Sequence, residues 1–317
     1  MIQKLVAGID IGGTNTTFGL VDEAGKILYK ETIFTEHFPI PEDLVAVVVE
    51  HINKALIQFE NKYELAGVGI GAPNGNYFNG CIVFAPNLKW KGIVPLAKLF
   101  EDKLKVKTIL TNDANAAAMG EMIFGGAKGM KDFIFITLGT GLGSGIVVNG
   151  EMVYGHDGFA GELGHITILF PDGRQCGCGR RGCLETYCSA TGIVTTYKEF
   201  IRRSFPELVK ENENITAKDI CEKARDGDFV SLTAFKMTGD LLGRVLANSV
   251  AYTSPQAIFL FGGLANAGYL IFEPTRESFE ENLLNIYKNK INIFPSQLKE
   301  NDAAILGAAS LIWKEIK

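Results

Sequence analysis

An internally duplicated α/β fold with two domains is predicted from the length of the chain and from two passages that share one rhythm. The chain has 317 residues, and domain-size statistics favour two domains of ~100–200 residues over one. In residues 7–14 and again in 137–144, an apolar strand enters a glycine-rich turn. A second apolar strand follows each turn, so one supersecondary unit occurs twice. Two related halves that face a cleft are therefore expected.

The first half is expected to open with three strands and then to alternate helices with strands. Apolar residues alternate, or recur at helical spacing, between turns rich in glycine, asparagine and aspartate. The expected elements are strands 5–11, 16–21 and 26–34, helix 42–59, strand 66–70, helix 95–103, strand 108–110 and a helix that begins near Asp113. This βββαβαβ order begins with an antiparallel meander.

The second half is expected to repeat this opening and then to become mostly helical. It contains strands 133–138 and 146–148, helices 192–203, 217–224 and 231–251, strand 257–261 and a last helix 303–317. Residues 133–150 carry no charge, but five glycines interrupt them, so a strand, a turn and a strand fit better than a membrane span. The pattern places a small α/β domain at 1–118, completed by helix 303–317, and a larger α/β domain with a metal loop at 119–302.

Charge and cysteine usage exclude several classes of protein. The net charge of -5 argues against nucleic acid as a partner, because a phosphate backbone demands a basic surface. Residues 1–8 lack the apolar stretch of a secretory signal, so a cytoplasmic protein without a membrane partner is expected. Three of the six cysteines cluster in residues 176–183, which in that compartment suggests a metal more than disulfides.

The first glycine turn is a candidate phosphate site. Gly12 and Gly13 let the backbone approach a phosphate, and Thr14 adds a hydroxyl donor. Asp10, just before the turn, offers a carboxylate to a magnesium ion through water. A plain hairpin that needs positive φ is the alternative interpretation.

A second glycine turn strengthens the phosphate interpretation. It contains Gly139, Thr140 and Gly141, and each glycine inside a strand costs ~0.5–1 kcal/mol, so a merely structural hairpin is disfavoured. Neither turn has the lysine of a Walker P-loop or the spacing of a Rossmann turn. Magnesium and backbone amides are therefore expected to neutralise the phosphates of a nucleotide.

Asp113 is the candidate general base. It stands where a strand passes directly into an alanine-rich helix, and a helix cap is the structural alternative. A carboxylate at the carboxyl end of a strand, opposite two phosphate-binding turns, is placed to accept the proton of an attacking hydroxyl. Asn112 is expected to form a hydrogen bond with a sugar hydroxyl next to the attacking one.

The strongest signal is a set of four metal ligands, His165, Cys176, Cys178 and Cys183. One imidazole and three thiolates make a closed tetrahedral set, which suits a structural zinc ion. Free thiols or a disulfide are the alternative. Glu162 and Glu185 flank these ligands in the sequence, so the ion would also fix both carboxylates as acceptors for sugar hydroxyls. The second ring nitrogen of His165 is available to another hydroxyl.

Two weaker signals concern a glycine pair and an asparagine. Gly262 and Gly263 follow an apolar strand, where the backbone can lie against adenine or ribose or simply turn into a helix. Asn87 is a candidate substrate contact, and Trp90 is expected to pack. The other histidines are expected to be surface or locally bonded residues, and the other cysteines buried thiols; they are His37, His51, His156, Cys81, Cys188 and Cys221.

Together these motifs resemble the ROK family (repressors, open reading frames, kinases), and most closely its glucokinase branch. The resemblance spans essentially the whole chain and includes Asp10 to Thr14, Asn112 to Asn115, Leu138 to Gly141 and the Glu-x-Gly-His and Cys-x-Cys-Gly-x-x-Gly-Cys-x-Glu signatures. It implies the duplicated actin-like ATPase (ribonuclease H-like) fold, ATP and Mg²⁺, structural Zn²⁺, and a homodimer or homotetramer. Asn74 departs from the family pattern, which often has glycine there, although asparagine tolerates the left-handed conformation.

The resemblance further implies an ATP-dependent hexose kinase that phosphorylates the 6-hydroxyl, with Asp113 as base and hydroxyl contacts from Asn112, Glu162, His165 and Glu185. Glucose is the expected hexose. Fructose, mannose, allose, N-acetylglucosamine and N-acetylmannosamine are alternatives, since single pocket contacts distinguish them. A ROK repressor is disfavoured by the early first turn and the acidic charge. A catalytically silent sugar sensor is the other alternative.

Overall fold

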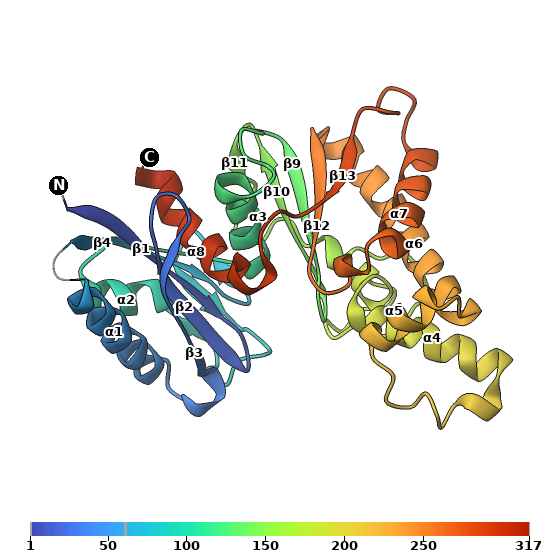
Figure 1. Cartoon of the computed structure of the whole chain (residues 1–317), viewed down its shortest axis with the longest axis horizontal. Coiled ribbons are helices and arrows are strands. Elements are labelled where there is room, and N and C mark those ends of the chain that lie inside the picture. The colour runs from blue at the N-terminus through green and yellow to red at the C-terminus, as the bar shows by residue number, and fades with distance from the viewer. Residues whose placement is uncertain (1, 60–61, 317) are drawn as a thin grey trace. The chain divides into compact units, whose positions relative to one another are not determined.

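The computed structural model describes residues 2–59 and 62–316 and contains two five-stranded sheets and one three-stranded sheet in these residues (Figure 1). The first sheet has the order β3-β2-β1-β4-β8. Strands β1, β2 and β3 form the antiparallel meander, and β4 and β8 run parallel to β1. The strands are β1 (Gln3–Ile11), β2 (Asn15–Val21), β3 (Ile27–Phe34), β4 (Tyr63–Gly71) and β8 (Thr108–Thr111).

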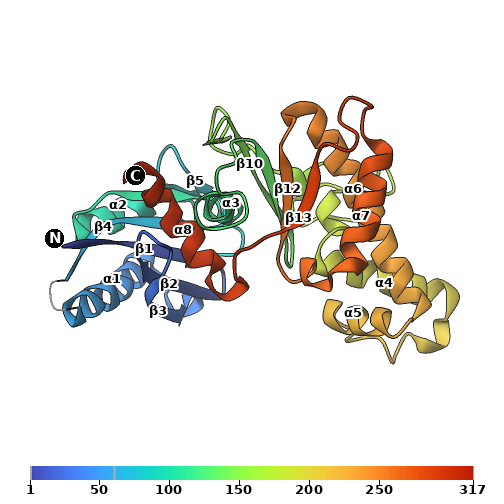
Figure 2. The same ribbon diagram turned by 45° about the horizontal axis from the view of Figure 1, so that its top comes forward.

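Helices cover both faces of this sheet. Because side chains alternate along a strand, the odd-numbered residues of β1 from Leu5 to Ile11 join the core that α1 fills, while Gly8 points to the other face. There α8 lies directly on the sheet, and a Cβ on Gly8 would stand 2.1 Å from the Ile305 carbonyl oxygen. Figure 2 shows α1 and α8 on opposite sides of β1. The helices are α1 (Pro41–Gln58), α2 (Leu96–Leu104), α3 (Asp113–Phe124) and α8 (Glu300–Ile316).

The second sheet repeats the strand order of the first, as the predicted duplication requires. Its order is β11-β10-β9-β12-β13, with β10 and β11 antiparallel and with β12 and β13 parallel to β9. The largest apolar core lies between this sheet and its helices. The elements are β9 (Phe133–Leu138), β10 (Leu142–Val148), β11 (Glu151–Met152), β12 (Ala257–Phe261), β13 (Asn292–Pro295), α4 (Ala190–Ser204), α5 (Ala217–Arg225), α6 (Phe229–Thr253) and α7 (Tyr269–Asn282).

The predicted elements are all present, with ends that shift by a few residues, and several other elements were missed. The missed elements include α7, which carries Pro274 inside the helix, a residue that argues against helix in a sequence. The small sheet was also missed because its strands have two or three residues each; it comprises β5 (Gly75–Asn76), β6 (Cys81–Val83) and β7 (Ile93–Val94). The predicted last residue of the final helix, Lys317, lies outside the described residues.

The uncharged run at 133–150 forms β9, a turn and β10, as predicted. Among the helices in residues 2–59 and 62–316, none combines the length and the apolar character that a membrane crossing requires.

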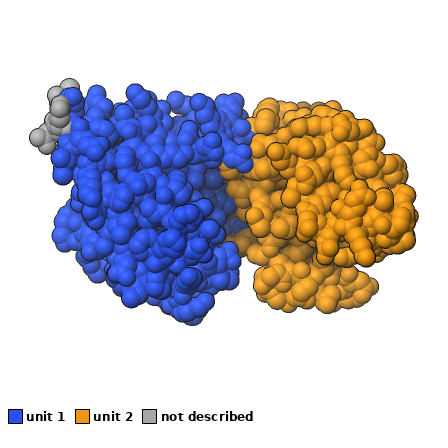
Figure 3. All heavy atoms as spheres, turned by 60° about the horizontal axis from the view of Figure 1, so that its bottom comes forward, with its two compact units in different colours: residues 1–130, 145–161, 296–317 blue, residues 131–144, 162–295 orange. Residues whose placement is uncertain are grey.

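The chain forms two compact units (Figure 3). Unit 1 comprises Met1–Met130, Gly145–Gly161 and Ser296–Lys317, and unit 2 comprises Lys131–Ser144 and Glu162–Pro295. The C-terminal helix therefore belongs with the N-terminal sheet. The predicted domain division at residue 118 stays a prediction.

Candidate active site

In unit 1 the parallel strands bring Asp10 and Asp113 together. Asp10 lies opposite Gly71 in the register of β1 and β4, and Gly71 lies opposite Thr111 in that of β4 and β8. The strands therefore end at one level, and Asp113 begins α3 just beyond β8. A Cβ on Gly71 would lie 3.5 Å from Asp10 Oδ1 and 3.6 Å from the Cα of Asp113. Gly71 therefore lies beside both carboxylate residues.

The surroundings of these two carboxylates oppose their ionisation. Burial, and then the charge of Asp113, raises the pKa of Asp10 to about 7. Asp113 itself stays accessible to solvent, yet the surrounding protein displaces enough water to raise its pKa, against the lowering effect of the Ala114 and Asp113 backbone N–H groups. Two nearby carboxylates with raised pKa values are typical of sites that hold a cation or move a proton.

The raised pKa of Asp10 predicts a pH-dependent gain in stability for Asp10→Asn. Between the ordinary value of 3.8 and about 7 the folded state binds the proton more tightly than the unfolded chain. The free energy of unfolding therefore falls as the pH rises through this window, by at most about 4 kcal/mol. A neutral asparagine removes that loss. Without Mg²⁺ and nucleotide, the variant should melt at a higher temperature than wild type at pH 8 and at the same temperature at pH 4.

Thermal unfolding at the two pH values measures this difference. Asp226→Asn, at an exposed position at the end of α5, is the matched control and should leave the pH dependence unchanged. A variant that is less stable than wild type at pH 8 would contradict the prediction.

Local hydrogen bonds fix the start of α3. Asn112 is the N-cap, and its Oδ1 accepts from the Ala114 backbone N–H at 2.8 Å. Asp113 Oδ1 accepts from the same group at 2.9 Å. The structural alternative supposed that Asp113 is the helix cap. Asp113 is instead the first residue of the helix, and Asn112 is the cap. Asn112, predicted to contact sugar, uses its oxygen to hold the helix, which leaves its NH₂ group as the part suited to a ligand.

The first glycine turn joins β1 to β2 and packs on Asn87. The Gly12 N–H donates to the Asn15 carbonyl at 2.8 Å. Neither Gly12 nor Gly13 has positive φ, so the plain-hairpin interpretation does not explain these glycines. A Cβ on Gly13 would lie 2.5 Å from the Asn87 carbonyl oxygen. Glycine is needed here for close approach, and the accessible Thr14 completes the turn.

In unit 2 the two other glycine motifs lie beside each other. They follow β9 and β12, which are parallel neighbours with Thr137 opposite Phe261. Gly262 has a φ of +100°, and a Cβ on it would lie 2.8 Å from the Leu138 carbonyl oxygen. Gly139 and Gly263 do not have positive φ, and a Cβ on either would have no neighbouring heavy atom within 4 Å. Their own chain does not require glycine, and the space is open to a ligand at the carboxyl ends of the strands.

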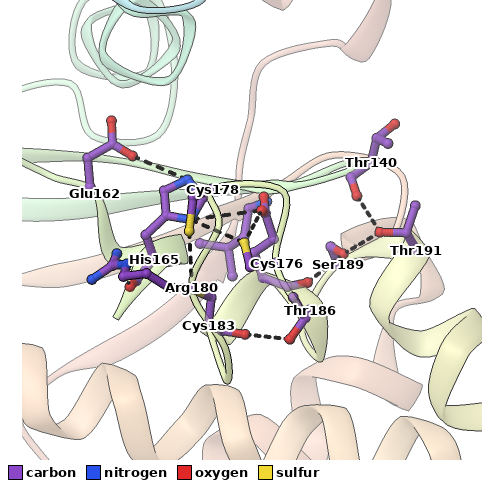
Figure 4. Close-up of polar contacts among 12 residues, drawn as sticks. Thr140, Glu162, His165, Cys176, Cys178, Arg180, Cys183, Thr186, Ser189 and Thr191 are labelled. Atoms are coloured by element: carbon purple, nitrogen blue, oxygen red, sulfur yellow. Dashed lines mark hydrogen bonds and ion pairs between the residues drawn. The ribbon is translucent and has the colours of Figure 1, made fainter. Parts of the chain in front are cut away.

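The four predicted metal ligands converge in unit 2 (Figure 4). Their ligand atoms all lie within 4.8 Å of one another. Cys178 Sγ is 3.6 Å from Cys183 Sγ, and Cys176 Sγ is 3.7 Å from His165 Nδ1. Bonds of about 2.3 Å to a tetrahedral zinc ion place sulfur atoms about 3.8 Å apart. The residues therefore fit a tetrahedral ion of this kind.

The thiols of this cluster titrate differently. Burial raises the pKa of Cys176 to about 12 and also raises that of Cys183. Burial also opposes ionisation of the exposed Cys178, but hydrogen bonds from Arg180 and from the other thiols outweigh it and lower its pKa to about 6. A zinc ion held by all three thiolates would displace the protons of these thiols.

The two predicted sugar-binding glutamates flank the cluster. Glu162 Oε2 lies 3.9 Å from His165 Nε2, while the other ring nitrogen, Nδ1, is the one that lies 3.7 Å from Cys176 Sγ. Glu185 Oε1 lies 3.4 Å from Cys176 Sγ. Glu185 Oε2 accepts from the Leu142 N–H at 3.2 Å, at the end of the second glycine turn. Glu185 thus contacts both the cluster and that turn, a link that the sequence alone did not predict.

Sequence reasoning missed Arg174, which joins the metal loop to α4. Its guanidinium donates to the Glu199 carboxylate, the Thr186 carbonyl and the Thr196 hydroxyl. It also lies over the Tyr187 ring at 4.3 Å from the centroid. An arginine two residues before Cys176 gave no periodic or spaced signal, because its partners are 12 to 25 residues away.

The minor predictions have mixed outcomes. His51 contacts Glu31 at 2.7 Å, and Trp90 is buried with its indole N–H donating to the Phe38 carbonyl, both as predicted. Asn74 has a φ of +51°, the left-handed conformation. Cys221 is only half-buried, so the prediction of a buried thiol was wrong there; it packs against the edge of the core.

Comparison with known proteins finds relatives over nearly the whole chain. A family model described as the ROK family matches residues 6–315. A glucokinase from Thermotoga maritima is 36% identical over 318 residues, with 99% of this chain and 98% of the relative covered. A xylose repressor from Bacillus spizizenii is 31% identical, with 96% of this chain and 76% of the repressor covered. The crystal structure of a ROK family glucokinase from Streptomyces griseus, in complex with glucose and AMPPNP, is 35% identical with a TM-score of 0.77, and covers 97% of this chain and 98% of that chain.

Proposed function

The chain belongs to the ROK family, and on this premise we propose that it is an ATP-dependent hexose kinase, with glucose as its hexose. The observation that carries the proposal is the carboxylate pair at the aligned strand ends of unit 1. Similarity over nearly the whole chain to glucokinases, one of them bound to glucose and the ATP analogue AMPPNP, supports the choice of substrates.

In the proposed reaction the Asp113 carboxylate accepts the proton of the sugar 6-hydroxyl. The hydroxyl oxygen then forms a bond to the γ-phosphorus of ATP, the bond from that phosphorus to the bridging oxygen breaks, and ADP leaves. Asn112, Glu162, His165 and Glu185 are proposed to orient the sugar hydroxyls. Substrate positioning of this kind supplies much of the catalysis in phosphoryl transfer.

The glycine turns are proposed to bind ATP. In unit 1, Gly12, Gly13 and Thr14 offer donors to phosphate oxygens. In unit 2, Gly139 and its neighbours Thr140 and Gly141 do the same, while the open space at Gly263, after Gly262, suits adenosine. Asp10 is proposed to hold Mg²⁺ through water, where the ion would neutralise developing charge on the phosphates.

The cluster His165, Cys176, Cys178 and Cys183 is proposed to bind a structural zinc ion. The distances among its ligand atoms suit tetrahedral coordination, and four protein ligands leave no open position for a catalytic water. The ion would fix the loop that precedes Glu185. A homodimer or homotetramer, without nucleic acid as a partner, also remains part of the proposal.

Purified protein with ATP and Mg²⁺ should release ADP when glucose is added. We expect glucose to give the highest kcat/KM in a panel with fructose, mannose, allose, N-acetylglucosamine and N-acetylmannosamine, because the glucokinase from Thermotoga maritima is 36% identical and is covered over 98% of its length. A higher kcat/KM with another sugar would keep the mechanism and change the substrate. Sugar binding without ADP release from any sugar would instead support a silent sensor, the role that similarity to repressors makes the second candidate.

A further inference from the structure

The segment after the last metal ligand contacts both the cluster and the second glycine turn. On the cluster side, the Thr186 hydroxyl donates to the Cys183 carbonyl at 2.7 Å. Glu185 lies 3.4 Å from Cys176 Sγ through Oε1, while its Oε2 accepts from the Leu142 N–H. A Cβ on Gly141 would lie 2.4 Å from this same oxygen. The glycine at 141 therefore makes room for the Glu185 carboxylate.

The first turn of α4 completes the contact with the glycine turn (Figure 4). The Thr191 hydroxyl donates to the Thr140 carbonyl at 2.8 Å, and the Ala190 N–H donates to the Gly139 carbonyl at 2.8 Å. The Ser189 hydroxyl donates to the Glu185 carbonyl at 2.7 Å and lies 3.0 Å from the Thr191 hydroxyl oxygen. Residues 185–191 thus form one bonded segment that ends on the glycine turn.

This segment supports the second glycine turn from outside. No neighbouring atom would contact a Cβ on Gly139. Within the turn, the Gly139 N–H donates to the Gly141 carbonyl at 3.1 Å, and the Gly143 N–H donates to the Thr137 hydroxyl at 3.0 Å. Glu185, Ala190 and Thr191 each add a hydrogen bond to the turn from the segment. A phosphate-binding turn must keep its amides aimed at the ligand.

We propose that Thr191 is a positioning residue for the nucleotide turn Gly139–Gly141, and that the segment 185–191 makes metal binding at the Cys₃His cluster and nucleotide binding at this turn mutually favourable. The proposal rests on the kinase function proposed above. If the cluster with its ion favours the arrangement that binds nucleotide, then bound nucleotide must favour metal binding by the same factor.

Thr191 is suited to the test because its hydroxyl is not the helix cap. The cap of α4 is Ser189, whose side chain accepts from the Gly192 N–H. Thr191→Val keeps the β-branched shape and removes the hydroxyl that donates to Thr140 and lies beside the Ser189 hydroxyl. Thr195→Val is the matched control: Thr195 is also exposed and lies one helical turn later, where its hydroxyl donates to the Thr191 carbonyl at 2.9 Å within the helix.

Calorimetric titration with MgAMPPNP, on zinc-loaded proteins, is the first measurement. Loss of one hydrogen bond predicts a Kd for MgAMPPNP about threefold to tenfold higher in Thr191→Val than in wild type. Thr195→Val should stay within about twofold, and both variants should keep one zinc per chain and a glucose Kd within about twofold of wild type. Equal nucleotide affinity in the two variants would overturn the positioning role.

Zinc affinity is the second measurement and needs no turnover. Competition with a zinc-selective chelator should give a lower zinc Kd in the presence of MgAMPPNP than in its absence, and Thr191→Val should shrink this difference. If wild type binds MgAMPPNP but its zinc Kd is the same with and without this nucleotide, the coupling is overturned and the kinase proposal stays in place. Absence of nucleotide binding from wild type would overturn both.

Discussion

Replacing Asp113 by asparagine is expected to lower kcat by about 10²- to 10⁴-fold, the range that a general base contributes. Asparagine cannot accept the proton of the sugar hydroxyl, so the attacking oxygen must lose it to water. Glucose and nucleotide should still bind, because the variant keeps the shape of the side chain. Steady-state ADP release and calorimetric binding of glucose separate these two effects.

The variant is expected to fold because the start of α3 does not depend on the charge of Asp113. The N-cap is Asn112, which accepts from the Ala114 N–H, and an asparagine at 113 retains an oxygen for the same donor. The raised pKa of Asp113 also means that the folded protein disfavours the charged form. Asp226→Asn should leave kcat unchanged. Wild-type turnover in a folded Asp113→Asn protein would remove Asp113 from the role of base.

Replacing Cys183 by serine is expected to abolish stoichiometric zinc binding and to lower the Tm by about 10 °C or more. Cys183 is fully buried, and its Sγ lies 3.6 Å from that of Cys178. A serine hydroxyl there is a poor zinc ligand, so the loop loses the bond that fixes it next to Glu185. The kcat/KM for glucose should fall by at least about tenfold as Glu185 loses its position.

Metal analysis, thermal unfolding and kinetics on one preparation measure these effects together. Cys221→Ser is the matched control, because Cys221 lies outside the cluster on α5 and is only half-buried. It should keep zinc and activity. A Cys183→Ser protein that retains one tightly bound zinc per chain would show that the cluster is not the metal site.

The cluster was predictable from sequence because its ligands are close along the chain. Three cysteines within eight residues, the first of them eleven residues after a histidine, have few uses other than metal binding, and the structure brings the four candidate ligand atoms within 4.8 Å of one another. The candidate proton acceptor, Asp113, was also visible, since it follows a strand and opens a helix. The roles of these residues in binding and catalysis stay predictions.

The contacts that were missed join residues whose separation follows no period. Arg174 binds Glu199, and Thr191 binds Thr140, across 25 and 51 residues. Glu185 contacts Leu142 across 43 residues. The register between β1 and β4, which sets Asp10 opposite Gly71, likewise exists only in the assembled sheet.

The sequence by itself determined the order of the elements along the chain, the repeated unit, the glycine turns and the set of candidate metal ligands, because each depends on residues that are near neighbours or on a pattern that recurs. Only the tertiary structure decided that Gly71 separates Asp10 from Asp113 and that Glu185 lies between the cluster and the turn at Gly141. Such contacts depend on the distance between elements that pack against each other in the folded protein. The residue types of a short stretch of sequence do not determine that distance.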